Sequence, residues 1–165
     1  MTTRRLTTIA ILTAMAIVLH LVESLFPAPL PIPGVKLGLA NIITIIALVL
    51  VDWKAALSVA VLRTVIGSLL SGTFFSVTFI LSFSGAILAA LIMVLIYLKF
   101  PKFSIIGISI AGAVMHNIAQ LGAAALIIDQ PGIYYYLPVL LIAAIPTGII
   151  TGLLASLLCK RLKKS

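Results

Sequence analysis

The chain has 165 residues, of which 63% are hydrophobic and 8% are charged, and its formal net charge is +8. This composition excludes a soluble globular domain and is typical of a protein embedded in the lipid bilayer. The basic residues mostly flank apolar stretches, where they set membrane topology, so they do not indicate nucleic acid binding. The single cysteine, Cys159, excludes a disulfide within the chain and a cysteine-based metal site.

Apolar stretches separated by short polar or proline-containing breaks predict an all-α bundle of six transmembrane helices, forming a single domain over residues 1–165. Arg4 and Arg5 precede the first stretch, as in a signal peptide, but the further spans favour an uncleaved first helix. The predicted helices cover about residues 6–26, 36–51, 54–71, 74–98, 104–128 and 134–158.

The segment between the first two predicted helices, residues 27–35, has a proline at every second position from 27 to 33. Proline lacks an amide donor and crowds the preceding turn, so this segment is not a regular helix. Its intervening apolar residues distinguish it from a solvated linker. We predict a loop that packs back over the protein as a gate, and the alternative is a rigid structural cap. The predicted gate residues are Pro31, Pro33, Gly34 and Lys36.

Lysine and arginine are distributed unevenly between the predicted loops. If both termini share one side, nearly all the basic residues at helix ends fall on that side, and only Lys36 falls opposite. The positive-inside rule then places both termini in the cytoplasm and the loop at 27–35 outside.

Polar side chains inside lipid are energetically costly, so their depth is informative. With a helical rise of about 1.5 Å per residue, Arg63 lies roughly 14 Å above Lys54, and Asn41 roughly 16 Å above Asp52. Both are near the middle of a hydrocarbon core of about 30 Å. The other strongly polar groups lie in the outer half. This distribution predicts a polar pocket that opens outward above an apolar plug, which disfavours a channel.

The predicted substrate-binding residues are Asn41, Arg63, Ser84, His116, Asn117 and Gln120. Arg63 is suited to an anionic or carbonyl group of a ligand, and its alternative role is a structural pair with Glu23 or with helix carbonyls. His116 and Gln120 share one helix face. Their alternative role, and that of Asn117, is hydrogen bonding between helices.

Small residues recur at four-residue spacing, which allows helices to approach closely in lipid. Internal bundle packing is the favoured role for most of these pairs. They are Ala10/Ala14, Gly67/Ser71, Gly85/Ala89, Gly107/Ala111 and Gly148/Gly152.

The sequence does not favour an enzyme. Ser84 and His116 form an incomplete pattern for a serine–histidine intramembrane protease, because Ser82 stands where a glycine is expected, and no oxyanion hole is identifiable. The only acidic residues, Glu23, Asp52 and Asp129, are too dispersed to hold magnesium for diphosphate chemistry. No catalysis, cofactor or metal is expected.

Three stretches together resemble a known family: PGVKLGLAN at 33–41, LRTVIGSLLSGTF at 62–74 and GAVMHNIAQ at 112–120. They resemble the bacterial Gx transporter family, often labelled heptaprenyl diphosphate synthase component I. That family is similar to the substrate-binding S components of energy-coupling factor (ECF) transporters. The resemblance implies a six-helix bundle in the bacterial cell membrane and an extracellular gate after the first helix.

The resemblance also implies partners. Small residues on the first helix of an S component dock to a transmembrane coupling subunit, whose two ATPase partners drive release, and Ala10 and Ala14 match that motif by position and spacing. The expected function is capture of a small vitamin- or cofactor-like solute from outside. The alternatives are a non-catalytic membrane accessory subunit of an isoprenoid, quinone or flavin-linked redox system, and a purely structural scaffold.

Overall fold

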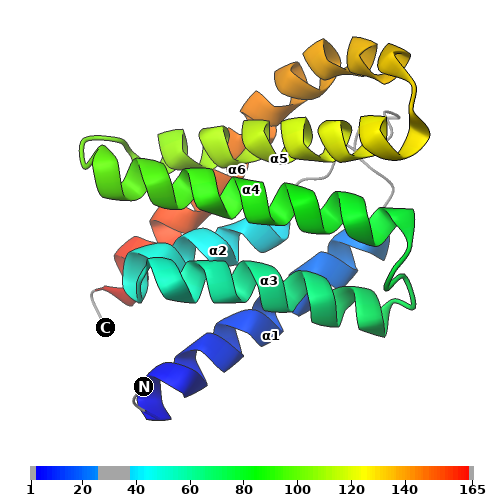
Figure 1. Ribbon diagram of the computed structural model, residues 1–165. Helices are drawn as coiled ribbons and strands as arrows, with labels where there is room; N and C mark the ends of the chain where they lie inside the picture. The colour runs from blue at the N-terminus through cyan, green and yellow to red at the C-terminus, as the bar shows by residue number, and fades with distance from the viewer. Residues whose placement is uncertain (1–2, 26–37, 164–165) are drawn as a thin grey trace.

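The computed structural model describes residues 3–25 and 38–163, and every regular element in these ranges is helical (Figure 1). The predicted helical membrane bundle is therefore confirmed. The elements in chain order are α1 (Thr3–Leu25), α2 (Leu39–Leu50), α3 (Trp53–Leu70), α4 (Val77–Lys99), α5 (Ile105–Ile128), the 3-10 helix η1 (Pro131–Tyr136) and α6 (Leu137–Leu162).

Most of the described helices are long and apolar enough to cross a membrane. Helix α2 differs, because its 12 residues extend only about 18 Å at the usual helical rise, less than a hydrocarbon core of about 30 Å. The sequence predicted this helix from residue 36, but residues 36 and 37 lie outside the described ranges. The segments that meet the criterion are Thr3–Glu23, Trp53–Leu70, Val77–Lys99, Ile105–Ile128 and Gly132–Leu162.

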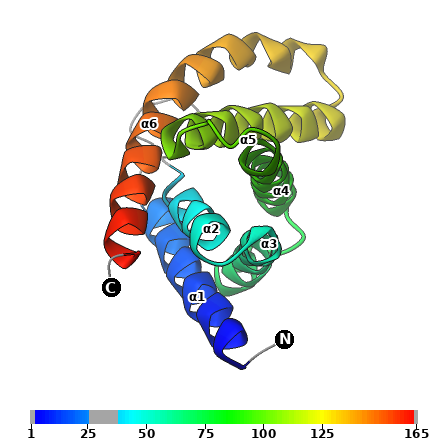
Figure 2. The ribbon, with the colours of Figure 1, turned by 90° about the vertical axis from the view of Figure 1, so that its left-hand side faces the viewer.

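Helix α2 is the centre of the bundle. It contacts every other α-helix among the described residues, and Figure 2 shows it enclosed by them in end view. All of its residues from Ala40 to Leu48 are buried. A helix that is apolar all round is favoured only where it is surrounded in this way. The outer helices follow the order α1, α3, α4, α5, α6, and consecutive members of this series are in contact.

Local chemistry shifts two helix starts from their predicted positions. The sequence predicted the fourth helix from residue 74, but Phe75 has a positive φ of 63° and Ser76 caps a helix that begins at Val77. The Ser76 hydroxyl accepts a hydrogen bond from the Phe79 amide at 3.3 Å, which satisfies a first-turn donor. The sixth was predicted from 134, whereas a 3-10 turn covers Pro131–Tyr136 and α6 begins at Leu137.

Glycines bring α5 and α6 into close contact. A Cβ atom built on Gly148 would lie 2.7 Å from the Ile110 Cα, and one on Gly152 would lie 2.8 Å from the Ile106 Cα. The hydroxyls of Ser109 and Thr151 meet at 2.9 Å in the same interface. This pair of glycines thus packs inside the bundle. In contrast, Ala10 and Ala14 on α1 are exposed.

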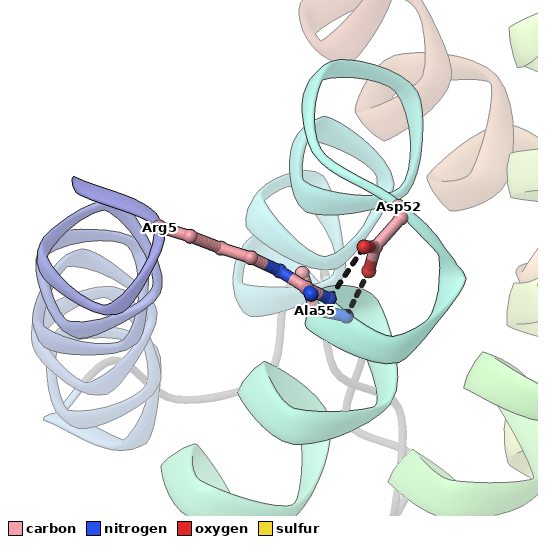
Figure 3. Close-up of polar contacts among 3 residues, drawn as sticks. All are labelled: Arg5, Asp52 and Ala55. Carbon is pink, nitrogen blue, oxygen red and sulfur yellow. Dashed lines mark hydrogen bonds and ion pairs between the residues drawn. The ribbon is translucent and has the colours of Figure 1, made fainter. Parts of the chain in front are cut away.

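The beginning of α1, the end of α6 and the α2–α3 and α4–α5 turns lie at the same end of the bundle, on the left in Figure 1. This arrangement agrees with the predicted topology, in which these segments share one side of the membrane. At this end, the Arg5 guanidinium forms an ion pair with the Asp52 carboxylate (Figure 3). The Ala55 amide donates to the same carboxylate at 2.7 Å, and together with Arg5 it lowers the pKa of Asp52.

Helix α6 bends around the bundle, as Figure 2 shows, and carries Pro146 in its interior. Proline cannot donate the backbone hydrogen bond of a regular helix and crowds the preceding turn. The Thr147 hydroxyl donates to the carbonyls of Ala143 and Ala144 beside this break, at 3.1 Å each. The outer part of α6, before Pro146, is thereby directed over the end of α5.

Candidate functional site

Polar side chains from all six α-helices converge on two adjoining small cavities. The first is lined by His20 and Glu23 of α1, Asn41 of α2, Arg63 and Thr64 of α3, Ser82 of α4 and His116 of α5. The second shares Gly38, Asn41 and His116 with the first and adds Asn117 of α5 and Thr147 and Thr151 of α6. We call these side chains the polar cluster. The sequence predicted Asn41, Arg63, His116 and Asn117 as site residues, and the fold brings all four together.

Arg63 is the charged centre of the polar cluster and is only 4% exposed. Its Nη2 atom donates to the Asn41 Oδ1 atom at 2.8 Å, and the Glu23 carboxylate attracts its charge. Its Nε atom has no hydrogen-bond partner among residues 3–25 and 38–163. An arginine carries five N–H donors in a fixed fork. The described residues thus give Arg63 structural partners and still leave a donor unfilled.

Glu23 joins the end of α1 to the start of α2. Its carboxylate accepts a hydrogen bond from the Gly38 amide. Gly38 precedes the first residue of α2 with a positive φ of 72°, a conformation that glycine adopts without strain. A carboxylate at a helix N-terminus also interacts favourably with the helix dipole. Glu23 therefore stabilises both the N-terminus of α2 and the charge of Arg63.

His116 and Gln120 of α5 lie against α4 at Gly85. A Cβ atom added to Gly85 would stand 2.8 Å from the His116 Cε1 atom and 2.9 Å from the Gln120 Cγ atom. The absence of a side chain at this position therefore makes room for both. Asn117 instead faces α6, where its Nδ2 atom donates to the Leu140 carbonyl at 2.9 Å. Its amide holds two helices together, which is the alternative role that the sequence left open.

Ser84 is placed differently from the other predicted site residues. Its hydroxyl donates to the Leu81 carbonyl at 3.0 Å, one turn back in its own helix, and Ser84 lines neither cavity of the polar cluster. Ser82 lines the first cavity in its place. Residues two apart on a helix point to nearly opposite faces. The sequence does not show which of these serines faces inward, and the packing of α4 decides it.

The site also includes residues that the sequence analysis did not assign to it. His20, Glu23 and Thr64 line the first cavity. His20 and Glu23 are spaced three apart near the outer end of α1, so they share a helix face. That spacing was the available signal for a joint role. The predicted gate residues Pro31, Pro33, Gly34 and Lys36 lie outside the described ranges.

The cavities differ greatly in size and lining. The two that form the polar cluster have volumes of about 20 Å³ each, which is room for about one water molecule. A larger cavity of about 340 Å³ lies between α4, α5, η1 and α6, at the lower end of the range for small-molecule sites. Its polar lining residues are Gln120 and Tyr136, and its apolar ones are Leu81, Leu121, Ala124, Ile128, Ile133 and Leu140.

The described residues offer no group of three or more His, Cys, Asp or Glu side chains suited to a metal ion. The three acids have separate surroundings. Asp52 pairs with Arg5 and caps α3, Glu23 bonds the Gly38 amide, and Asp129 is exposed at the end of α5. What the site offers chemically is a buried cation, an imidazole and amides, which are groups that bind a solute by hydrogen bonds and charge.

Fold and site together define a multi-pass helical membrane protein with a buried polar cluster. Residues 12–158 match the family described as heptaprenyl diphosphate synthase component I, and the chain belongs to that family. The predicted family is thus confirmed. Neither curated proteins nor solved structures give a match to this chain.

Proposed function

We propose that this protein is the substrate-binding S component of an ECF-type importer in the bacterial cytoplasmic membrane, and that it captures a small vitamin- or cofactor-like solute from the extracellular side. The observation that carries the proposal is the convergence of polar groups from all six α-helices around Arg63. Polar and charged side chains at membrane depth are costly and mark solute pathways by default. An unfilled arginine donor within such a cluster favours a ligand with anionic or carbonyl character.

The proposed site is contracted in this structure. Cavities of about 20 Å³ each admit water but no vitamin-sized solute. Binding at the polar cluster therefore requires neighbouring helices to move apart. We assign this movement to the part of α6 that precedes Pro146 and to residues 27–35, which are predicted as the gate.

The partners that we propose are a transmembrane coupling subunit and two ATPase subunits. The support comes from α1, whose outward face is apolar and exposed over most of its length. That face comprises Leu6, Ala10, Ile11, Ala14, Met15 and Val18. The two alanines make a shallow strip among larger side chains, which allows a second helix to approach closely.

We propose a non-catalytic role. The acids are occupied in structural contacts or isolated, and the polar cluster contains no paired carboxylates to bind a catalytic metal. Capture and orientation of a solute need only the groups that the cluster supplies.

The test is co-purification followed by ligand identification. We expect the tagged protein, extracted in mild detergent, to carry a coupling subunit and two ATPases. Denaturation of the sample should release a small solute, which mass spectrometry detects. The variant His116→Ala with Arg63→Lys should lose that solute, because an ammonium lacks the planar fork of arginine. The control Leu126→Ala, on the exposed side of α5, should retain it. A solute retained by the double variant would exclude the polar cluster as its site.

A second candidate function follows from the family description, which names a component of a synthase. A non-catalytic accessory subunit would form a stable complex with a prenyl diphosphate-synthesising enzyme or a related redox enzyme and would carry no solute. The same purification separates the two candidates, because the partners differ in size and activity.

A further inference from the structure

A cavity near the polar cluster has a composition of its own. It lies between α4, α5, η1 and the part of α6 that precedes Pro146, and its volume is about 340 Å³. Among the described residues no charged side chain lines it, and six of the eight residues that do line it are aliphatic. A charged group brought into such surroundings would lose its hydration without compensation. The cavity is therefore suited to an uncharged, mainly apolar molecule.

Gln120 presents an amide side chain in the cavity wall. The residue is only 8% exposed as a whole and lines the cavity, and its amide is not among the buried polar atoms without a partner in the described part of the chain. The amide therefore faces the open space of the cavity. Asn117, three residues earlier on α5, is instead engaged by the Leu140 carbonyl. A carbonyl or hydroxyl group of a ligand placed in this cavity would form a hydrogen bond with the Gln120 amide.

Gln120 also stands at the boundary with the polar cluster. It and His116 both contact the Gly85 position of α4, one helical turn apart. His116 lines both cavities of the polar cluster, and Gln120 lines the large cavity. A molecule lying in the large cavity with its polar end at Gln120 thus has that end directed toward the cluster.

We propose that this cavity binds the apolar body of an uncharged small molecule whose hydrogen-bonding group, a carbonyl or a hydroxyl, is held by the Gln120 amide. The assignment rests on the proposed function, since it names the class of solute that the protein would capture. It narrows that class to amphipathic molecules and excludes compact polyanions such as free diphosphate. The ligand enters either from the aqueous phase or from the surrounding lipid.

The test uses the full chain in lipid nanodiscs and two neutral probes of equal size, 2-naphthol and 2-methylnaphthalene. Equilibrium dialysis, with empty nanodiscs as the blank for partition into lipid, measures the affinity. We expect saturable binding of both probes. Gln120→Leu should weaken the affinity for 2-naphthol about tenfold, because the hydroxyl loses its hydrogen-bond partner. The same substitution should leave the affinity for 2-methylnaphthalene nearly unchanged.

A second variant fills the cavity. Ala124→Phe should abolish binding of both probes, whereas Leu126→Phe, on the same helix but directed outward, should bind as the wild type does. If Ala124→Phe does not elute as a folded protein, Ile128→Trp narrows the cavity from its exposed rim. The proposal is overturned if no saturable binding exceeds the blank, if the filled cavity binds like the wild type, or if Gln120→Leu affects both probes equally.

Two further arms complete the experiment. Incorporating 1-dodecanol into the nanodisc lipid shows whether the ligand enters from the lipid or from the aqueous phase. Displacement of 2-naphthol by 1-dodecanol assigns a lipid ligand, and no displacement assigns an aqueous one. Co-purification of the coupling subunit with Ala124→Phe separates this proposal from the proposed function. Filling the cavity should abolish probe binding and spare the complex. Probe binding that persists counts against the cavity proposal, and a coupling subunit that does not co-purify counts against the proposed function.

Discussion

At the scale of single residues, Arg63 is a buried charge that has structural partners and, within the described part of the chain, a donor without one. Its Nη2 atom holds the Asn41 side chain on α2, and its charge is balanced by Glu23 on α1. Both alternatives derived from the sequence are thus compatible with the same residue. Burial of a charge without partners would be strongly unfavourable, so the three residues depend on one another.

We expect Arg63→Ala to destabilise the folded protein by about 1 to 3 kcal/mol, because it removes the hydrogen bond to Asn41 and the attraction to the Glu23 charge. Removing both charges in Arg63→Ala with Glu23→Gln should recover a substantial part of that loss. A double-mutant cycle on unfolding in mixed detergent measures the coupling. Additive effects of the two substitutions would show that Glu23 does not stabilise Arg63.

Asp52 gives the protein a pH-dependent contact outside the membrane-spanning segments. The Ala55 amide and Arg5 lower the pKa of its carboxyl below the ordinary 3.8. A lowered pKa in the folded state stabilises the fold above the ordinary value, and the stabilisation is lost as pH falls through the folded value. We expect wild type to melt above Asp52→Asn at pH 6 and the difference in melting temperature to shrink as pH falls below 3.8. A difference that stays the same across this acid range would contradict this origin.

At the scale of elements, apolar length identified the helices, whereas local chemistry fixed their ends. A run of apolar residues predicts a span because backbone groups in lipid must bond within the helix. The start of α4 depends on Phe75 in a left-handed conformation and on the Ser76 cap, and α6 follows a 3-10 turn. Such choices among turn types are nearly equal in energy, and the sequence alone does not decide between them.

Small residues pack inside the bundle at the α5–α6 interface, where their role can be tested. Gly148→Ala would place a Cβ atom 2.7 Å from the Ile110 Cα atom, so backbone must shift. We expect a loss of about 1 to 3 kcal/mol, the usual result of overpacking. Gly122→Ala is the control, since a Cβ there meets nothing within 4 Å. Melting temperatures of the two variants provide the comparison, and equal values would show that α5 and α6 are not tightly fitted.

Ala10 and Ala14 on α1 test the proposed docking of a coupling subunit. We expect Ala10→Leu with Ala14→Leu to change stability by less than about 0.5 kcal/mol, because both positions are exposed, and to reduce co-purification of the coupling subunit. Ala16→Leu is the contrasting variant, because Ala16 is 0% exposed and a larger side chain there should destabilise the bundle. An intact complex in the double variant would show that the coupling subunit docks on another surface.

At the scale of the whole molecule, the sequence indicates which polar side chains lie within the helices but not how each helix is rotated. Asn41, Arg63, His116 and Asn117 were predicted to share a site because polar groups in lipid are costly wherever they occur, and the structure places them together. Which serine of α4 faces inward depends on how that helix is turned against its neighbours. The large cavity beside Gln120 was not predicted, since side chains from four elements form it and all but two are aliphatic.

The predicted orientation is open to a direct experiment. In a Cys159→Ala background, we expect Gln130→Cys to react with a membrane-impermeant maleimide on intact cells, and Lys102→Cys to react only after permeabilisation. Both positions are exposed and lie at opposite ends of α5. The positive-inside rule predicts this labelling pattern, and the reverse pattern would show that the topology is the opposite one.

The short connection between α2 and α3 has a consequence for biosynthesis. Only Val51 and Asp52 separate the two helices, and Asn41 on one bonds Arg63 on the other. As the chain leaves the ribosome, α2 is too short to anchor itself and α3 carries a buried charge. We expect the two to leave the translocon together as a helical hairpin with the amide already paired to the guanidinium. In a nascent chain truncated between them, α2 should remain outside the lipid although α1 is inserted, and addition of α3 should complete the insertion of both.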